Sequence, residues 1–380
     1  MRRKNTFGLL YSVILIAAIF GPAEASEAQK IISPEGYSWP SNTRDYWPTN
    51  DWRVDRPEAH GVDIAKLQRA EDLARADSQM RALLVIKNGK LVYENYFHGG
   101  ARDRSDEVWS VTKAVTSAAI GVAIYEQRIG STDDLMRSYL PQYSDFGTIT
   151  IEDVLTHKTG LAWEEEGASF VNWLLADDPV ADALSREKQS QRGAQFLYSS
   201  GNTHFLSALI NEVSGESLGE YVDERLFDPI GIVFDRQTDP ERITSWEQFL
   251  PAAPQTWKQD AMGREFGPFG LNLTAREMAK FGFLLLNCGW WDGAQLMPAE
   301  WVELSAIDHA RRRENWGFGY GLVVSKRAGQ LTFNADGWGG QIISIIPSLD
   351  MIVVIKSDSE NPRGHPYYEI LTAATEAGVE

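Results

Sequence analysis

The sequence predicts an α+β fold: one antiparallel sheet built from both ends of the chain and flanked by helices, with a mostly helical lobe inserted. Strand-like apolar runs occur near residue 80 and return after residue 318, whereas helical periodicity dominates the stretch between them. Strands at both ends of a helical segment are typical of α+β domains. We therefore expect one domain over 26–380, with an α/β lobe at about 60–104 and 311–380 and a helical lobe at about 105–310.

The first residues predict a signal peptide over residues 1–25. A basic start, Met1-Arg-Arg-Lys-Asn5, precedes an apolar run that is short for a membrane span, and Ala23-Glu-Ala25 offers a small-x-small cleavage site. The alternative is an uncleaved membrane anchor, which the helix-breaking Gly21-Pro22 disfavours. We expect a mature chain that starts near Ser26, is secreted or periplasmic, and has no stable membrane association after cleavage.

The composition disfavours some classes of binding partner. The formal net charge of −17 argues against nucleic acid or an anionic membrane surface. The single cysteine, Cys288, cannot form an internal disulfide, and its position after the apolar run 281–286 predicts a buried, inert thiol. The sequence leaves the oligomeric state open.

The elements follow from periodicity and turn signals. Residues 26–60 are rich in Pro, Trp, Asn and Asp without a period, which predicts an extended arm lying over the body. A helix is expected at 64–74, and Asn88-Gly89 between two strand-like runs is a strong hairpin signal. The expected strands are Ala82–Lys87, Leu91–Phe97, Tyr320–Ser325, Leu331–Asn334, Gln341–Ile346 and Met351–Ile355, the last two joined by Pro347–Asp350. A short helix, Tyr367–Ala377, closes the chain.

One helix carries the first candidates for chemistry. From Val111 to Ala123 apolar residues recur with helical spacing, which predicts a helix buried along one side with Ser110 at its first turn. Lys113 lies about one turn above Ser110 on the same flank. Burial and the positive end of the helix dipole both favour the neutral amine of Lys113, which can take a proton from the serine hydroxyl. The backbone N–H of Ser110 can then meet a developing oxyanion.

Ser-x-x-Lys fixes only two residues and is weak evidence by itself. A second copy, Ser185 to Lys188, lies in a polar run without an apolar stripe, which predicts a solvated loop or helix end. For Ser110 the structural alternative is a helix N-cap serine followed by an exposed lysine. A nucleophile is expected only if other parts of the chain supply its partners.

Tyr198 is the next candidate. It lies in Phe196–Asn202, a loop of small polar residues before an apolar helix at 205–213. A loop tyrosine can place its phenol over a nucleophile, and beside a lysine ammonium we expect the pKa of Tyr198 to fall, so that it acts as general base and then as acid. The alternative is an ordinary loop tyrosine packed on a helix.

The last candidate is the glycine-rich stretch Asn334–Gln341, which we expect between two strands. Its three glycines indicate close approach of the backbone to a ligand or to another chain segment. An edge strand facing Ser110 could supply the second N–H for an oxyanion. A glycine-rich turn with a bulge is the alternative.

These three motifs, in this order, resemble those of the penicillin-recognising serine hydrolases. Within that superfamily the chain resembles class C beta-lactamases, D-alanyl-D-alanine carboxypeptidases and, most closely, the branch of esterases and 6-aminohexanoate-dimer hydrolases. The resemblance covers most of residues 80–357 and implies a beta-lactamase/transpeptidase-like fold. It extends to the connecting segments Val154–Leu161, Gly193–Gly201, Phe269–Ala275 and Gly339–Gln341.

The resemblance implies a role for each motif. Ser110 would be acylated, Lys113 would activate it, and Tyr198 would move protons in acylation and deacylation. Ser200 stands in place of the asparagine of the class C Tyr-x-Asn pattern and could still hydrogen-bond Lys113 or the substrate. The N–H groups of Ser110 and Trp338 would form the oxyanion hole. No metal or organic cofactor is implied.

Departures from the family pattern bear on the substrate. The third motif of the family commonly carries a basic residue that faces a beta-lactam carboxylate, whereas the matching place here reads Ala335-Asp336-Gly337. Lys158-Thr-Gly160 precedes Tyr198 and ends a helix, so we expect it to be structural. Asp336 would repel a carboxylated antibiotic, which favours a small ester or amide with a neutral or cationic end. The candidates to line an apolar cleft are Trp109, Trp163, Trp173 and Trp338.

Other assignments fit the sequence less well. Gly215–Gly219 matches Gly-x-Ser-x-Gly, but a predicted helix precedes it where that motif needs a strand, and Ser217 with Glu220 forms a capping box. The six histidines show no paired ligand spacing, which disfavours a metal hydrolase.

The sequence therefore predicts a serine hydrolase resembling a carboxylesterase or a 6-aminohexanoate-dimer-hydrolase-like amidase, acting on a small-molecule ester or amide. A beta-lactamase or a D-alanyl-D-alanine carboxypeptidase is the alternative. A non-catalytic binding relative of the same fold is the second alternative, although a pure binder has no chemical need for Ser110, Lys113 and Tyr198 together.

Overall fold

The computed structural model describes residues 36–41, 43–234, 242–243, 245, 248, 257–310, 316–358 and 366–379. The predicted signal peptide at residues 1–25 and the first part of the predicted arm lie outside these residues. In the part of the chain that the structure describes, no helix has both the length and the apolar character needed to cross a membrane.

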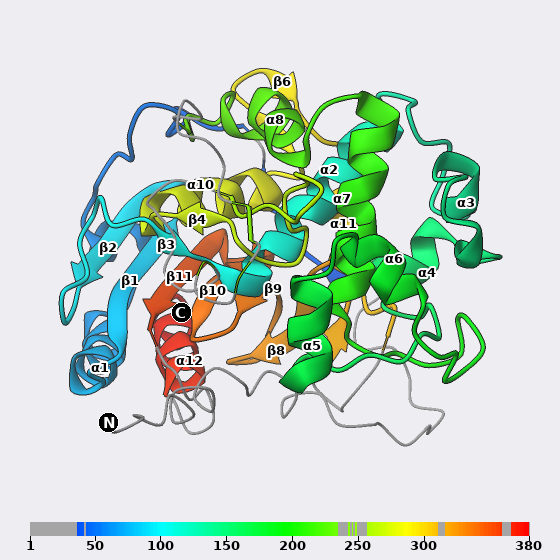
Figure 1. Cartoon of the computed structure of the whole chain (residues 1–380). Helices are drawn as coiled ribbons and strands as arrows, with labels where there is room; N and C mark the ends of the chain where they lie inside the picture. Colours follow the sequence, from blue (N-terminus) through cyan, green and yellow to red (C-terminus); the bar gives the residue numbers. More distant parts are fainter. Residues whose placement is uncertain are drawn as a thin grey trace, which may run out of the picture.

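A seven-stranded antiparallel sheet is built from both ends of the chain, as the sequence predicted (Figure 1). The strands lie in the order β2-β1-β11-β10-β9-β8-β7, so the N-terminal hairpin pairs with the last strand of the chain. Their bounds are β1 (Met80–Lys87), β2 (Lys90–Tyr96), β7 (Trp316–Phe318), β8 (Val323–Arg327), β9 (Gln330–Gly337), β10 (Gln341–Ile346) and β11 (Met351–Ser357).

Turn chemistry explains where these strands begin and end. Asn88 and Gly89 have φ angles of 51° and 75°, the positive values that a two-residue type I′ hairpin needs, and they join β1 to β2 as predicted. One predicted strand, Tyr320–Ser325, is wrong at its start. Gly321 has a φ of 72° and turns the chain there, so β7 ends at Phe318 and β8 begins at Val323.

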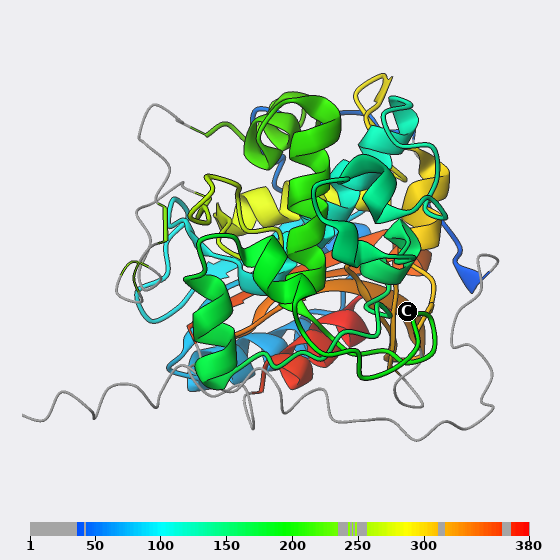
Figure 2. The same cartoon turned by 45° about the vertical axis from the view of Figure 1, so that its right-hand side comes forward.

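The sheet is covered by helices on both faces (Figures 1 and 2). The terminal helices α1 (Ile64–Ala76) and α12 (Tyr367–Ala377) lie side by side on one face and bury a cluster of aliphatic side chains against it. Helix α10 (Ala275–Leu286) packs on the other face, where Gly282 leaves room for Ile343 of β10. The sequence assigned these residues to the helical lobe of 105–310. The structure shows instead that α10 packs directly on the sheet.

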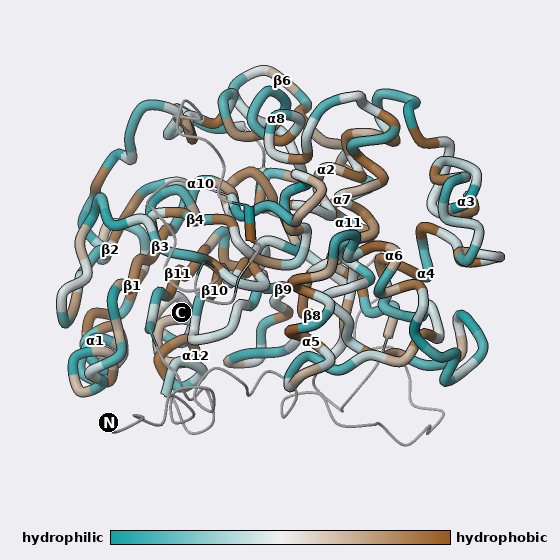
Figure 3. The backbone as a smooth tube through the Cα atoms, in the orientation of Figure 1, coloured by the Kyte–Doolittle hydropathy of each residue, from teal (hydrophilic) through white to brown (hydrophobic). Residues whose placement is uncertain are grey.

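The remaining helices form a layer beside the sheet, with α2 and α7 at its centre (Figure 1). Figure 3 shows hydrophobic residues along β1 and α7, where side chains are buried, and hydrophilic residues along outer loops. The α-helices are α2 (Thr112–Tyr125), α3 (Met136–Tyr139), α4 (Ile151–Leu155), α5 (Gly167–Leu174), α6 (Pro179–Leu184), α7 (Ser200–Ser214), α8 (Leu218–Val222) and α11 (Ala299–Ser305). Short strands are β3 (Asp106–Glu107), β4 (Asn272–Leu273), β5 (Trp290–Trp291) and β6 (Ala294–Gln295), and 3-10 turns are η3 (Pro57–His60), η4 (Trp109–Val111), η5 (Ser144–Phe146) and η7 (Pro347–Leu349). A π-helical turn, η6 (Asp223–Phe227), follows α8.

Two local predictions can be compared directly with the structure. The described part of the arm lies on the body: Trp52 is buried against the core, and Arg44 makes paired hydrogen bonds of 2.6 and 2.8 Å to Asp350.

Cys288, however, is half-buried rather than fully buried. Burial nevertheless raises the pKa of its thiol to about 12, so the thiol stays protonated and unreactive at neutral pH.

Candidate active site

Ser110 lies in η4, the single 3-10 turn that leads into α2, and its side chain is half-buried. The preceding residue, Trp109, has a φ of 49°, a left-handed conformation that is rare for a bulky residue and costs about 1–3 kcal/mol. The surrounding fold holds this turn. Val108 N–H donates to the Leu271 carbonyl at 2.8 Å, which continues the short ladder between β3 and β4 up to the turn. Such local strain is typical of functional sites.

Lys113 lies on the first turn of α2 with only 2% of its surface exposed. Its Nζ is 3.0 Å from Ser110 Oγ, 3.2 Å from the Pro268 carbonyl oxygen and 3.3 Å from Ser200 Oγ. Burial lowers the pKa of Lys113 to about 8, against the opposing effect of the negative charge on Glu165. The amine is thus in contact with the hydroxyl, and its pKa shifts in the direction that the sequence predicted.

Tyr198 is buried beside both residues. Its ring centroid is 4.8 Å from Lys113 Nζ, and its phenol is hydrogen-bonded with the Ser110 side chain. The expected fall in the pKa of Tyr198 is wrong. Burial, together with the negative charges of Glu165 and Asp336, raises the pKa of Tyr198 well above 10, so the phenol keeps its proton at neutral pH.

His157 supports Tyr198 from behind. The two rings stack with centroids 5.0 Å apart and an interplanar angle of 16°, and His157 Nδ1 accepts the Ser199 N–H at 2.9 Å. Burial and the charge of Lys113 lower the pKa of His157 well below 6.5, which keeps the imidazole neutral. This histidine therefore fixes both the ring of Tyr198 and the backbone that follows it.

Helix α7 begins earlier than its apolar pattern predicted, because Ser199 caps it by accepting the Asn202 N–H at 3.1 Å. The cap brings Ser200 to the first helical position, where its hydroxyl reaches Lys113 and donates to Glu165 Oε2 at 2.7 Å. Glu165 Oε1 accepts two more bonds, from the Ser200 N–H at 2.5 Å and from Trp163 Nε1–H at 2.7 Å. Burial raises the pKa of Glu165, and Lys113 opposes that shift.

The glycine-rich strand approaches the Ser110 turn, as expected from its glycines. A methyl group added to Gly337 at the end of β9 would overlap the Val108 carbonyl oxygen. The Trp338 ring packs edge-on against Trp109 with centroids 5.0 Å apart. The close approach seen here is therefore to a neighbouring chain segment.

Asp336 is oriented differently from what its motif suggests. Its partner across the ladder, Ile342, belongs to the cluster beneath α1 and α12, and paired residues share a face of the sheet. The Asp336 carboxylate accepts the Tyr368 hydroxyl of α12 at 2.6 Å, and burial raises its pKa to about 6. The expected repulsion of a carboxylated substrate by Asp336 is not supported by this position.

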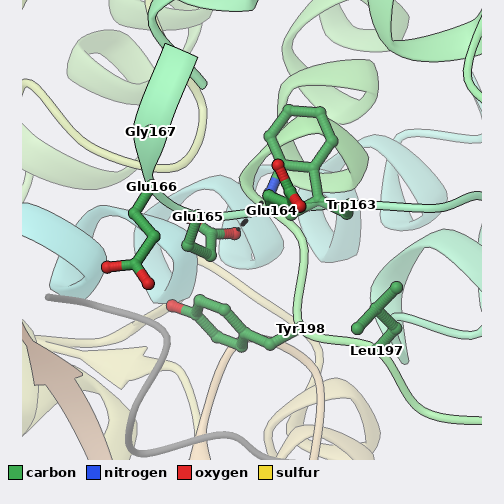
Figure 4. A pocket seen from close by; sticks show the side chains of 7 residues that line it. All are labelled: Trp163, Glu164, Glu165, Glu166, Gly167, Leu197 and Tyr198. Atoms are coloured by element: carbon green, nitrogen blue, oxygen red, sulfur yellow. Dashed lines mark hydrogen bonds between the residues drawn. The ribbon is translucent and has the colours of Figure 1, made fainter. Parts of the chain in front are cut away.

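A pocket of about 430 Å³ opens beside Tyr198 (Figure 4). Figure 4 shows the Glu166 carboxylate and the Tyr198 hydroxyl pointing toward the same space. Among the described residues that line the pocket, three are glutamates and none is basic. The lining residues are Trp163, Glu164, Glu165, Glu166, Gly167, Leu197 and Tyr198.

The tryptophans divide between this site and the core. Trp163 lines the pocket, and its ring fits against α7 only because residue 201 is glycine. Trp173, in contrast, is completely buried and donates to the Pro179 carbonyl at 3.0 Å, so the prediction that it lines a cleft is wrong. Trp109 and Trp338 lie together over the Ser110 turn.

Other sequence candidates have structural roles. Ser185 and Lys188 are exposed, and Lys158 of the out-of-order Lys-Thr-Gly donates to the His309 carbonyl. Gly215 ends helix α7, and Ser217 with Glu220 forms the predicted capping box of α8. Among the described residues, no group of three or more His, Cys, Asp or Glu side chains is arranged to hold a metal ion.

Two residues of the site were missed by sequence reasoning. Glu165 is part of an acidic run, Glu164-Glu165-Glu166, which by composition resembles a solvated loop. His157 has no periodic signal of its own. His157 lies within the connecting segment Val154–Leu161, and Glu165 follows it closely. Their position in the sequence does not reveal that they contact Tyr198 and Ser200.

The chain is similar in sequence to known proteins. The family described as Beta-lactamase matches residues 71–375. The chain is 26% identical over 241 residues to PbpX of Bacillus subtilis strain 168, which is provisionally described as a penicillin-binding protein, with 61% of this chain and 59% of that protein aligned. The chain thus spans less than two thirds of that relative. It is also 23% identical over 311 residues to the 6-aminohexanoate-dimer hydrolase of Paenarthrobacter ureafaciens, with 74% and 73% aligned.

A solved structure shares the fold. It is provisionally described as a 6-aminohexanoate-dimer hydrolase from Bacillus anthracis and superimposes with a TM-score of 0.65 at 22% identity, covering 87% of this chain and 86% of that one. The family match covers both lobes and the residues around Ser110. The chain therefore belongs to the beta-lactamase family, within the penicillin-recognising serine hydrolases.

Proposed function

We propose that this serine hydrolase cleaves small esters or amides through an acyl-enzyme on Ser110. The observation that carries the proposal is the 3.0 Å contact between Ser110 Oγ and the buried amine of Lys113. A buried amine with a lowered pKa is a suitable base for a serine hydroxyl, because a substantial fraction is neutral near physiological pH.

The proposed mechanism follows from the protonation states of the site. Neutral Lys113 takes the Ser110 hydroxyl proton as Oγ attacks the substrate carbonyl carbon, and the carbonyl electron pair moves to oxygen. The N–H groups of Ser110 and Trp338 stabilise that oxyanion. Tyr198, which stays protonated, then donates its proton to the leaving group as the ester or amide bond breaks, and recovers a proton from Lys113.

Deacylation uses the same groups. Water attacks the acyl carbonyl carbon, its proton passes to the Tyr198–Lys113 pair, and Ser110 leaves as a hydroxyl. The products are a carboxylic acid and an alcohol or amine, and Ser110, Lys113 and Tyr198 return to their starting protonation states.

The pocket supports a preference for substrates without a carboxylate near the scissile bond. Its wall carries Glu164 and Glu166, and none of the described residues that line it is basic. A carboxylate there would face like charges, whereas a neutral or ammonium group would not. The relative named 6-aminohexanoate-dimer hydrolase supports the amide arm of the proposal, because a 6-aminohexanoate dimer is by its name a linear amide with an amino group at one end and a carboxylate, remote from the amide bond, at the other.

The proposal is tested with a matched panel of substrates and Ser110→Ala. The panel contains neutral short-chain p-nitrophenyl esters, a linear amide with a free amine, a D-Ala-D-Ala peptide and nitrocefin. We expect turnover of the neutral esters or the amine-bearing amide, weaker turnover of the two carboxylated substrates, and loss of all turnover in Ser110→Ala. Turnover retained by Ser110→Ala would remove Ser110 from the mechanism.

The panel also decides between the alternatives. A strong preference for nitrocefin would favour a beta-lactamase, and a strong preference for the D-Ala-D-Ala peptide would favour a carboxypeptidase; either result would overturn the proposed substrate class. Binding without turnover of any of them would favour the non-catalytic alternative.

A further inference from the structure

The hydrogen bonds around Lys113 have directions that the chemistry of its neighbours fixes. The Pro268 carbonyl, 3.2 Å from Nζ, can only accept a hydrogen bond. The hydroxyls of Ser200 and Ser110, at 3.3 and 3.0 Å, can donate or accept. Which of these hydroxyls receives an N–H decides where the lone pair of the neutral amine points.

Glu165 determines the direction of the Ser200 hydroxyl. Its Oε1 accepts the Ser200 N–H and Trp163 Nε1–H, two groups that can only donate. Its Oε2 lies 2.7 Å from Ser200 Oγ, with both residues buried. Burial raises the pKa of Glu165, whereas the three hydrogen bonds that it accepts from Ser200 and Trp163 lower it and favour the ionised form. In that ionised form the carboxylate accepts on both oxygens and takes the single hydroxyl proton of Ser200. The oxygen of Ser200 is left to accept from Lys113.

We propose that Glu165, acting through Ser200, aims the lone pair of the neutral Lys113 amine at the Ser110 hydroxyl. A neutral amine has two N–H bonds, and in this arrangement the carbonyl of Pro268 takes one and Ser200 takes the other. The lone pair then faces Ser110 Oγ. The inference rests on the proposed function and makes Glu165 a positioning residue for it.

The proton balance of the activation step is complete within these groups. The Ser110 hydroxyl proton moves to Lys113 Nζ as the Oγ–carbon bond to the substrate forms. The resulting ammonium has three N–H bonds, two of which remain on Pro268 and Ser200 while the third faces Ser110. Glu165 keeps its charge throughout, and that charge stabilises the ammonium.

Without the carboxylate, the direction of the Ser200 hydroxyl reverses. In Glu165→Gln, the amide oxygen is held by the two N–H donors, so the amide nitrogen faces Ser200 and donates to it. The Ser200 proton must then turn toward Lys113 and compete with Ser110 for the lone pair. The loss of charge has a second effect, because Glu165 raises the pKa of Lys113; its removal lowers that pKa further.

In the described part of the chain, the titratable groups that act on Lys113 or on its neighbours are few. Glu165 faces it from the loop before α5, and Tyr198 from the loop before α7. His157, packed behind Tyr198, is kept neutral by burial, and Asp336 acts on Tyr198 rather than directly on the amine. Of these groups Glu165 is the carboxylate that acts on Lys113, so a change in pH dependence can be assigned to it.

A double-mutant cycle tests the inference. The rate of acylation by a neutral p-nitrophenyl ester is measured across pH for wild type, Glu165→Gln, Ser200→Ala and the double variant. We expect each single variant to lower the high-pH plateau by roughly tenfold or more, since base catalysis depends on this alignment. In the Ser200→Ala background, Glu165→Gln is expected to cause no further loss, because Glu165 acts through Ser200.

The acid limb gives an independent readout. It is expected to move to lower pH in Glu165→Gln, whereas a merely structural role would lower the plateau without moving the limb. Glu126→Gln is the matched control: its carboxylate binds Arg225 and Arg128 at the far end of α2, and we expect a wild-type profile. A wild-type plateau in Glu165→Gln, or additive losses in the cycle, would overturn the inference.

Two further variants keep the test decisive. If Glu165→Gln fails to fold, Ser200→Thr, which keeps the hydroxyl, is expected to retain most of the rate that Ser200→Ala loses; equal rates in the two variants would overturn the inference. Ser110→Ala distinguishes a failure of the proposed function from a failure of the role of Glu165. Turnover in Ser110→Ala contradicts the proposed function, whereas an inactive Ser110→Ala with a wild-type profile in Glu165→Gln contradicts only the role of Glu165.

Discussion

At the scale of single residues, protonation states decide what the site can do. Lys113 is buried, and burial lowers its pKa to about 8, so the amine can lose its proton close to physiological pH. Tyr198 has the opposite shift, because burial and the negative charges nearby disfavour the phenolate. The base and the acid of the proposed mechanism are therefore distinct side chains, Lys113 and Tyr198.

This division predicts the pH dependence of kcat/KM. Activity should require neutral Lys113, so it rises with pH and reaches its half-maximal value near the lysine pKa of about 8. Because the pKa of Tyr198 is raised well above 10, the plateau should persist to about pH 9.5. The measurement is hydrolysis of a neutral ester across this range, with circular dichroism to verify folding at each pH. A falling rate between about pH 8 and 9.5 in folded protein would contradict the assignment of Tyr198.

At the scale of elements, the site depends on three segments that meet from distant parts of the chain. The turn η4 presents Ser110, the start of α7 brings Ser200 to Lys113, and the end of β9 packs against the backbone before Ser110. The strained φ of Trp109 is tolerated because the surrounding backbone is fixed by β3 and β4.

Gly337→Ala tests the contact between β9 and the Ser110 turn. The added methyl group overlaps the Val108 carbonyl, so we expect a cost of about 1–3 kcal/mol in the free energy of unfolding. Because the strand end must move away from Ser110, kcat should fall by roughly tenfold or more.

The matched control for this variant is Gly329→Ala in the β8–β9 turn, where a methyl group meets no atom but the φ of 76° is unfavourable for alanine. It is expected to lower thermal stability slightly and to leave kcat unchanged. Equal kcat values in wild type and Gly337→Ala would show that the approach of β9 is not required.

Sequence reasoning predicted most elements but few of the contacts between them. Periodicity and Asn88-Gly89 were sufficient for the hairpin and the terminal helices, because those signals are local. The orientation of Asp336 depends on strand register, which places it opposite Ile342 and toward Tyr368. The shift of Tyr198 depends on charges contributed by remote segments, including Glu165, so no local pattern could predict its direction.

At the scale of the whole molecule, the site lies where the sheet and the helical layer share one core. A single hydrophobic cluster includes Phe333 and Ile343 from the sheet and Val115, Trp173 and Phe205 from the helical layer. The lobes predicted from the sequence are therefore continuous in packing. Such a shared core fixes the η4–α2 segment that carries Ser110 and Lys113, and Tyr198 packs in a smaller cluster with Phe318 of β7.

The most direct test of the central claim is covalent labelling of the intact protein. A fluorophosphonate probe should add one label per chain, and peptide mapping should place it on Ser110, because an activated hydroxyl reacts where the many ordinary serines do not. Ser110→Ala should remain unlabelled while it keeps the wild-type circular dichroism spectrum. A label on another residue, or equal labelling of folded Ser110→Ala, would contradict the account.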